Sequence, residues 1–266
     1  MTEVLDFARR FGGVSRLYGA EGLLQLQAAH ICVVGIGGVG SWAAEAVARN
    51  AVGTITLIDL DNIAESNVNR QLHALDGAFG LAKVSAMSAR IRLINPSANV
   101  AEIEDFVTAE NVHEILSHDF DGVIDCIDDA KAKAAIAGFC KSHNIPLVMT
   151  GAAGGRLDVT RIKQADLSLV SHDKLLAKVR NLLRRDYAFA KAEVSKNKAA
   201  AFGIQCIYSD EEVIKPNSVC DASDTVDSSN SAITGLNCAG YGSSVCVTAP
   251  FGFAAAGLLI KQLLHK

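Results

Sequence analysis

Apolar and polar positions alternate along the chain in the way that is typical of an α/β fold. An apolar run at 33–34 breaks into glycines between 35 and 40, and apolar residues then recur with a helical period over 42–50. The strand and helix patterns continue to alternate over 54–58, 80–93, 98–103, 109–117, 122–127, 130–143 and 146–150. Strands that alternate with helices form βαβ units, so the pattern predicts a Rossmann-like, mostly parallel sheet. An amphipathic helix is predicted at 21–30, ahead of the first strand.

The pattern changes beyond residue 165. Strands are predicted at 159–162 and 203–208, around a long helix from 173 to about 191. We expect one domain, 1–266, with a nucleotide-binding core at 1–165 and an antiparallel C-terminal extension at 166–266. Within the extension, the segment 217–241 is rich in Ser, Asp, Asn and Gly, which predicts a mobile loop.

The segment 245–260 is uncharged and mostly apolar, but it is shorter than the ~20 residues of a typical membrane span. Pro250 and two glycines interrupt it. A buried strand-to-helix element is therefore favoured over membrane association. The first ten residues carry acids and arginines and no apolar stretch, so we expect no signal peptide and a cytoplasmic protein.

The glycine-rich loop predicts a site for a nucleotide phosphate. Glycines let the backbone turn sharply and approach a ligand closely, and the following helix directs its N-terminus at an anion. Asp59 ends the next strand, where a carboxylate can accept both hydroxyls of a ribose. The alternative is a tight turn without a ligand. The residues predicted to hold the nucleotide here are Gly35, Gly37, Gly38, Gly40, Ser41, Asp59 and Asp61.

Polar residues suited to phosphate binding follow the second strand. Arg70 can bind two phosphate oxygens, Asn67 can bind one, and Lys83 begins a predicted helix. Asp128 lies at the carboxyl end of a later strand, where it could hold Mg²⁺ or an attacking group. Alternatively, Asp128 or Asp129 could only cap the helix at 130–143.

The composition narrows the classes of partner. The chain has 266 residues and a net charge of −4, which argues against a surface coated with nucleic-acid-binding charge, and no DNA partner is expected. The helix at 173–191 is the exception, because it concentrates basic residues that could bind tRNA or another polyanion, or could form a solvated face. They include Lys178, Arg180, Arg184 and Arg185. Seven cysteines without a Cys-x-x-Cys pair indicate reduced thiols and no structural zinc site; Cys238 could be a nucleophile or a spectator.

These motifs together resemble the ubiquitin-activating-enzyme superfamily of ATP-dependent adenylyltransferases. The resemblance rests on Gly35-x-Gly37-Gly38-x-Gly40-Ser41, Asp59-x-Asp61, Asn67-x-Asn69-Arg70-Gln71, Lys83 and Asp125-Cys126-Ile127-Asp128. It implies that the glycine loop and Asp59 hold ATP, and that Asn67, Arg70 and Lys83 hold its phosphates. It also implies that Asp128 lies beside Mg²⁺ and the α-phosphate. The four zinc cysteines of the bacterial activators of ubiquitin-like proteins are absent.

The segments 10–19, 151–156 and 249–253 extend the resemblance to a branch of the family that acts on tRNA. The branch implies ATP-driven cyclisation of a threonylcarbamoyl group on tRNA adenosine, with loss of water. It also implies a homodimer in which an arginine, Arg10 or Arg16, crosses to the partner active site, and a cysteine desulfurase or sulfur acceptor as a further partner. The alternatives are an activator of a ubiquitin-like or sulfur-carrier protein, and an NAD-dependent oxidoreductase or binding module that shares only the glycine loop.

Overall fold

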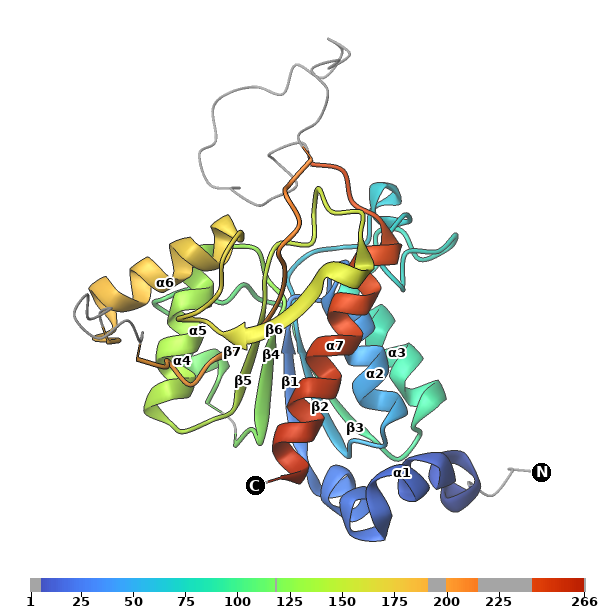
Figure 1. The fold of residues 1–266 in the computed structure, drawn as a ribbon. Helices are drawn as coiled ribbons and strands as arrows, with labels where there is room; N and C mark the ends of the chain where they lie inside the picture. Colours follow the sequence, from blue (N-terminus) through green and yellow to red (C-terminus); the bar gives the residue numbers. More distant parts are fainter. Residues whose placement is uncertain (1–5, 118, 191–199, 215–240, 266) are drawn as a thin grey trace.

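The computed structural model describes residues 6–117, 119–190, 200–214 and 241–265 (Figure 1). The predicted loop at 217–241, apart from Tyr241, and Cys238 therefore lie outside the described residues.

The described residues build one seven-stranded sheet, in the order β3-β2-β1-β4-β5-β7-β6. All neighbouring strands are parallel except β6, which pairs antiparallel with β7 at one edge. The prediction of a mostly parallel sheet with an antiparallel C-terminal addition is confirmed. The strands are β1 (His30–Val34), β2 (Thr54–Ile58), β3 (Asn99–Ile103), β4 (Gly122–Asp125), β5 (Leu147–Thr150), β6 (Ile162–Asp166) and β7 (Gln205–Ser209).

Helices cover both faces of the sheet (Figure 1). On one face, apolar residues of α2, α3 and α7 pack in a single core, and on the other face α4, α5 and α6 do the same. The helices are α1 (Phe7–Ala28), α2 (Gly40–Arg49), α3 (Lys83–Ile94), α4 (Val112–Ile115), α5 (Ala130–Ser142), α6 (Lys174–Asp186) and α7 (Val245–Leu264).

The strand register brings the predicted site residues to one edge of the sheet. Val34, the last residue of β1, pairs with Ile58 of β2 and with Asp125 of β4. Asp125 in turn pairs with Met149 of β5. Four loops therefore leave the sheet side by side at its carboxyl edge, where open α/β sheets bind ligands.

Helix α1 packs beside the amino ends of the strands, on the side of the sheet opposite the carboxyl ends (Figure 1). The carbonyl of Leu26 accepts the N–H of Gly53, just before β2 begins. Arg10 donates to the carbonyls of Leu93 and Ile94 at the end of α3, at 3.1 and 2.7 Å. The backbone of α1 breaks at Gly19, which has a φ of 80° and a ψ of 167°, so the helix predicted at 21–30 corresponds to the second part of α1. The first part, which begins at Phe7 and is capped by Asp6 through the N–H of Arg9, was not predicted.

Two predictions for the extension were wrong in detail. The segment 159–162 is not a strand but a 3-10 turn, η2 (Val159–Arg161), followed by β6, because Asp158 accepts the N–H and hydroxyl of Thr160. The basic helix begins as predicted but ends at Asp186 rather than near 191. Its C-cap residue, Tyr187, then packs against Gly138 of α5.

The segment 245–260 is helical throughout, not strand-to-helix. Helix α7 continues through Pro250, and two residues later Gly252 packs closely on Val39 and Ala43 of the glycine-loop region, where a Cβ would clash. In the described part of the chain, α7 is the one helix long and apolar enough to cross a membrane, but 56% of its most apolar window is buried within the fold. That burial is typical of a core helix.

Candidate active site

A cavity of about 890 Å³ opens at the carboxyl edge of the sheet. Its wall combines the glycine loop, the segments after β2, β3, β4 and β5, the first turn of α6, and the start of α7. The predicted site residues that line it are Gly35, Gly37, Gly38, Asp59, Asp61, Arg70, Lys83 and Asp128.

The glycine loop is shaped by two glycines that no other residue could replace. Gly35 has a φ of 84°, in the left-handed region, and its N–H donates to the carbonyl of Ile58 at 2.8 Å. A Cβ on Gly40 would clash with the carbonyl oxygen of Gly35. Ser41 is buried, and its hydroxyl accepts the N–H of Leu72 at 3.3 Å. Gly40 and Ser41 thus stabilise the loop without lining the cavity, whereas Gly37 and Gly38 line it.

Asp59 fastens the glycine loop to the end of β2. Its two carboxylate oxygens accept the N–H of Ile36 at 2.6 Å and the N–H of Asp61 at 2.9 Å. The side chain is 8% exposed, and this burial raises its pKa. The sequence predicted a ribose-binding carboxylate here; the structure adds a loop-holding role that the motif alone does not reveal.

Lys83 brings a buried cation to the cavity from the first turn of α3. Its ammonium nitrogen lies 2.6 Å from a carboxylate oxygen of Asp61 and 3.7 Å from one of Asp59. The Lys83 side chain is 7% exposed, whereas that of Asp61 is 54% exposed. A cation held between two carboxylates at the cavity wall is fixed in position and can exchange one partner for a phosphate oxygen.

Arg70 lies against the glycine loop. A Cβ on Gly38 would approach the Arg70 side chain to 3.1 Å, and the guanidinium donates to the carbonyl of Ser66 and the side chain of Asn69, both at 2.9 Å. Burial lowers the pKa of Arg70. Asn67 is not among the cavity-lining residues; its side-chain oxygen accepts the N–H of Ala64 at 3.0 Å. Its phosphate contact stays a prediction.

The turn after β4 separates the roles of its two acids. Both line the cavity, but Asp129 also accepts the N–H of Ala132 at 2.8 Å and caps α5. Among the described residues no group of three or more His, Cys, Asp or Glu could hold a metal by itself. A cation bound by Asp128 would therefore need further oxygen ligands from a phosphate-bearing substrate, which suits Mg²⁺.

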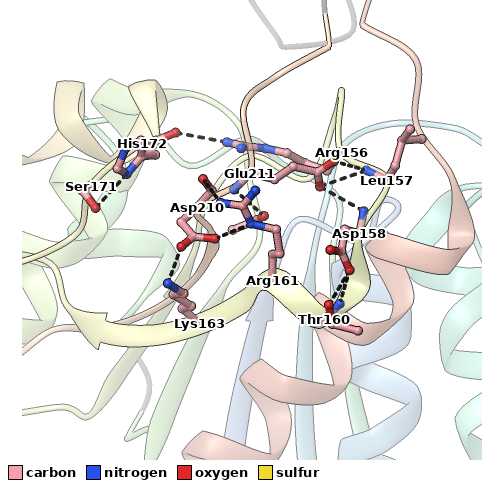
Figure 2. Close-up of polar contacts among 11 residues, drawn as sticks. Arg156, Leu157, Asp158, Thr160, Arg161, Lys163, Ser171, His172, Asp210 and Glu211 are labelled. Atoms are coloured by element: carbon pink, nitrogen blue, oxygen red, sulfur yellow. Dashed lines mark hydrogen bonds and ion pairs between the residues drawn. The ribbon is translucent and has the colours of Figure 1, made fainter.

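The loop after β5 forms the far wall of the cavity, and a polar network anchors it (Figure 2). The Glu211 carboxylate accepts the N–H groups of Leu157 and Asp158 at 3.0 Å each. Arg156 donates to the carbonyl of His172 at 3.2 Å, and Gly155 donates to the carbonyl of Gly242 at 2.7 Å. These contacts hold the backbone of 151–154 in place.

Several cavity residues were not singled out from the sequence. Gln71 stands in the quoted motif but was given no role, and Lys131 and Thr248 belong to helices whose patterns carry no chemical signal. The loop after β3 also lines the cavity, through residues 105–110. Only the three-dimensional fold brings these segments to the same edge of the sheet.

The basic residues of α6 divide into two groups. Arg180 points inward, donating to the carbonyls of Val170 at 2.6 Å and Leu167 at 3.3 Å, and burial lowers its pKa. Arg184 lies over the ring of Phe202, at 5.4 Å. Arg185 is exposed but pairs with Asp186 at 2.7 Å. Lys178 is exposed. The exposed basic surface is thus smaller than the sequence predicts.

Helix α6 also connects to the cavity. Leu175, in its first turn, lines the cavity wall, and the N-cap residue Asp173 accepts the N–H of Ala152 at 2.8 Å. Lys174 is exposed at the start of the same helix. A polyanion that follows the exposed side of α6 would therefore reach the cavity mouth.

Arg16 does not contribute to this cavity within one chain. It is exposed on α1, which packs at the amino edge of the sheet. The cavity opens at the carboxyl edge. Its rival, Arg10, is already bound to the end of α3.

Comparison with known proteins places the chain in a family. The ThiF family model matches residues 9–264. The chain is 44% identical to tRNA threonylcarbamoyladenosine dehydratase of Haemophilus influenzae, covering 100% of this chain and 97% of that protein. The Escherichia coli (strain K12) protein of the same name is 45% identical, over 97% of this chain and 94% of the relative.

The fold agrees with this comparison. The crystal structure of E. coli tRNA N6-threonylcarbamoyladenosine dehydratase in complex with ATP superposes with a TM-score of 0.85 at 42% identity, covering 99% of this chain and 98% of that one. The family match spans both the glycine loop and α7. The chain belongs to the ThiF family.

Proposed function

We propose that this chain catalyses the ATP-dependent dehydration of N6-threonylcarbamoyladenosine in tRNA to its cyclic form. The observation that carries the proposal is the convergence of Arg70, Lys83 and Asp128 on a glycine loop within one cavity. Relatives that are 44–45% identical over nearly their whole length bear the corresponding name. A structure with TM-score 0.85 was solved with ATP.

The chemistry follows from the poor reactivity of a carboxylate. An oxygen of the substrate carboxylate attacks the α-phosphorus of ATP, and pyrophosphate leaves. A nitrogen of the same side chain then attacks the activated carbon, closes the ring and loses a proton, while AMP leaves with the carboxylate oxygen. Because the second attack is intramolecular, holding the side chain in one conformation supplies much of the rate.

The residues of this chain would act on charge and position. Arg70 and Lys83 would stabilise the negative charge that develops on the departing pyrophosphate. The backbone of Gly37 and Gly38, which line the cavity just before α2 begins, would bind the nucleotide phosphates. Asp59 and Asp61 would bind the ribose, and Asn67 a phosphate oxygen. The roles of the cavity-lining residues rest on their positions in the cavity wall, whereas the role of Asn67, which does not line the cavity, rests on the family resemblance alone.

Asp128 would hold Mg²⁺, which when bound would neutralise phosphate charge beside the α-phosphorus. The fit is chemical: one cavity-facing carboxylate with phosphate oxygens is a common Mg²⁺ site.

We also propose a homodimer in which Arg16 reaches the cavity of the partner chain. Within one chain, α1 and the cavity lie at opposite edges of the sheet, so Arg16 can act only on a second copy. Mixing an Arg16→Ala chain with an Asp128→Ala chain should restore part of the activity that each lacks. Failure of any mixture to regain activity would contradict shared sites.

The tRNA is proposed to run along α6, with Lys174 and Lys178 as its main exposed contacts and Arg185 beside them. A sulfur-transfer partner remains a prediction from the resemblance.

Calorimetric titration with ATP and Mg²⁺, and separately with NAD⁺, tests the nucleotide. ATP should bind and NAD⁺ should not. AMP release should then depend on tRNA that carries threonylcarbamoyladenosine, with unmodified tRNA as the control. Tight NAD⁺ binding without ATP binding would contradict the adenylation chemistry.

A further inference from the structure

Lys131 places an exposed cation at the wall of the cavity. Among the described residues it is the third cation that lines the cavity, after Arg70 and Lys83. Lys83 is buried and Arg70 is half-buried, whereas Lys131 is exposed. The charge of Lys131 is therefore open to a ligand at the cavity mouth without any change in the fold.

Lys131 lies on the other side of the sheet from the residues proposed to hold the triphosphate (Figure 1). It belongs to the first turn of α5, whose apolar residues pack with those of α4 and α6. Arg70 lies against Gly38 of the glycine loop, and Lys83 begins α3, which packs on the opposite face. Because the phosphate chain of ATP already has two cations there, a third cation across the cavity suits a different anion.

The starts of α5 and α6 lie side by side at the cavity mouth. The two helices pack against each other, and both begin at the carboxyl edge of the sheet. Asp129 caps α5, and Asp173 caps α6 and accepts the N–H of Ala152, just after β5. Lys174 is exposed at the start of α6, as Lys131 is in the first turn of α5. Lys131 thus continues the exposed basic side of α6 to the cavity wall.

The proposed substrate explains why an anion would lie at this mouth. A nucleoside that reacts inside the cavity is still joined to the tRNA backbone, so its flanking phosphates remain at the mouth. Its carboxylate must reach the α-phosphorus beside Asp128, and Lys131 follows Asp128 by three residues. An exposed ammonium on a long, flexible side chain at this distance from the reacting atoms can bind one of those phosphates.

We propose that Lys131 binds a backbone phosphate next to the modified nucleoside and contributes nothing to the binding of ATP. The inference rests on the proposed function and adds a contact that depends on the nucleoside being part of a polynucleotide.

Glu110, on the loop after β3, is the acidic neighbour of Lys131 at the cavity wall. The hydrogen bond from Thr108 lowers the pKa of Glu110, and the nearby charge of Lys131 lowers it further. A phosphate bound by Lys131 would be repelled by Glu110. Glu110→Gln should therefore bind the tRNA about threefold more tightly. Tighter binding would support the contact, and binding no tighter than wild type would place the phosphate away from this pair.

The main test uses Lys131→Gln in the full-length protein, a change that preserves length and helix propensity. The kcat/KM for tRNA carrying threonylcarbamoyladenosine should fall about tenfold, the usual loss for one hydrogen bond to a charged group. The slope of log affinity against log salt should decrease by about one unit. The KM for ATP should stay within twofold, and the melting temperature should not change.

Lys141→Gln is the matched control. Lys141 is an equally exposed lysine in the last turn of α5, at the end of the helix that is away from the cavity. This variant should match the wild-type protein in kcat/KM and in salt slope.

A synthetic RNA identifies the group that Lys131 binds. The modified nucleoside is flanked on both sides either by native phosphates or by neutral methylphosphonates. With wild-type protein, the neutral linkages should lower kcat/KM about tenfold. With Lys131→Gln they should have little further effect, because the charge pair is already broken.

Three results would overturn the inference: wild-type kcat/KM for the tRNA in Lys131→Gln, an undiminished effect of the neutral linkages in that variant, or a rise in the KM for ATP alone. Failure of the proposed function is distinguishable, because then the wild-type protein itself would release no AMP with modified tRNA.

Discussion

The ammonium nitrogen of Lys133 lies 2.9 Å from a carboxylate oxygen of Asp125, and neither side chain is exposed to solvent. The same oxygen accepts the N–H of Ile127 at 3.2 Å. Burial raises the pKa of Asp125, and the charge of Lys133 opposes that rise. The ion pair therefore holds the turn that carries Asp128 to the cavity.

Lys133→Met is expected to destabilise the protein by about 3 to 5 kcal/mol, because it leaves a buried carboxylate without its cation. Denaturant unfolding measures the change. The double variant Lys133→Met with Asp125→Asn removes both charges and keeps an acceptor for Ile127, so it should regain most of the lost stability. Equal stability of the single and double variants would show that the pair is not coupled.

Arg70→Ala, Lys83→Ala and Asp128→Ala are each expected to lower turnover on the order of a hundredfold or more, by removing stabilisation of charge in the transition state. Single-turnover AMP release with saturating ATP measures this effect, and circular dichroism checks the fold. Asp129→Asn is the control beside Asp128, since asparagine also caps helices well. Near-normal turnover in a folded Asp128→Ala protein would remove that carboxylate from the chemistry.

Stability should fall in mild acid because of His73. The residue is 4% exposed, neither ring nitrogen has a hydrogen-bond partner among the described residues, and burial lowers its pKa from 6.5 to about 4. The unfolded chain binds a proton that the folded chain excludes, so stability is lost as pH falls from 6.5 toward 4, by about 3 kcal/mol at most.

Urea unfolding of the wild-type protein and of His73→Leu at pH 7 and pH 4.5 checks this prediction. The variant should lose less stability between the two pH values, since leucine does not titrate. An identical loss in both proteins would assign the acid sensitivity to other groups.

The sequence predicted the strands and the glycine loop well because their signal is local. Apolar runs of the right length and the glycine spacing determine β1, β2 and the turn between them, and the register then brings Asp59 and Asp128 to one edge. Periodicity could not show that Asp158 would fold 159–161 into a turn. Nor could it show that α7 would continue through Pro250 and pack closely on α2.

The direction in which long side chains point was the least predictable property. Arg180 and Lys178 look equivalent in the sequence, yet Arg180 bonds two carbonyls of the preceding loop and Lys178 is exposed. Thr248 carries no motif, and its place in the cavity depends on the packing of a helix more than a hundred residues from the glycine loop.

The exposed lysines of α6 give a prediction for tRNA binding. Lys174→Glu with Lys178→Glu should weaken tRNA binding and reduce the slope of log affinity against log salt by about one unit per lost phosphate contact. Filter binding at several salt concentrations measures it, and ATP affinity should not change. Arg180→Glu is the contrast, since it should mainly lower the melting temperature. An unchanged salt slope in the double lysine variant would place the tRNA elsewhere.

The mass of the modified nucleoside tests the proposed reaction most directly. The protein is incubated with ATP, Mg²⁺ and tRNA carrying threonylcarbamoyladenosine, and the tRNA is digested to nucleosides under mild conditions. Cyclisation with loss of water should lower the nucleoside mass by about 18 Da, with one AMP released for each ring closed. An unchanged nucleoside mass, with AMP released only when a small protein with a Gly-Gly tail is added, would contradict the proposal and identify a carrier-protein activator.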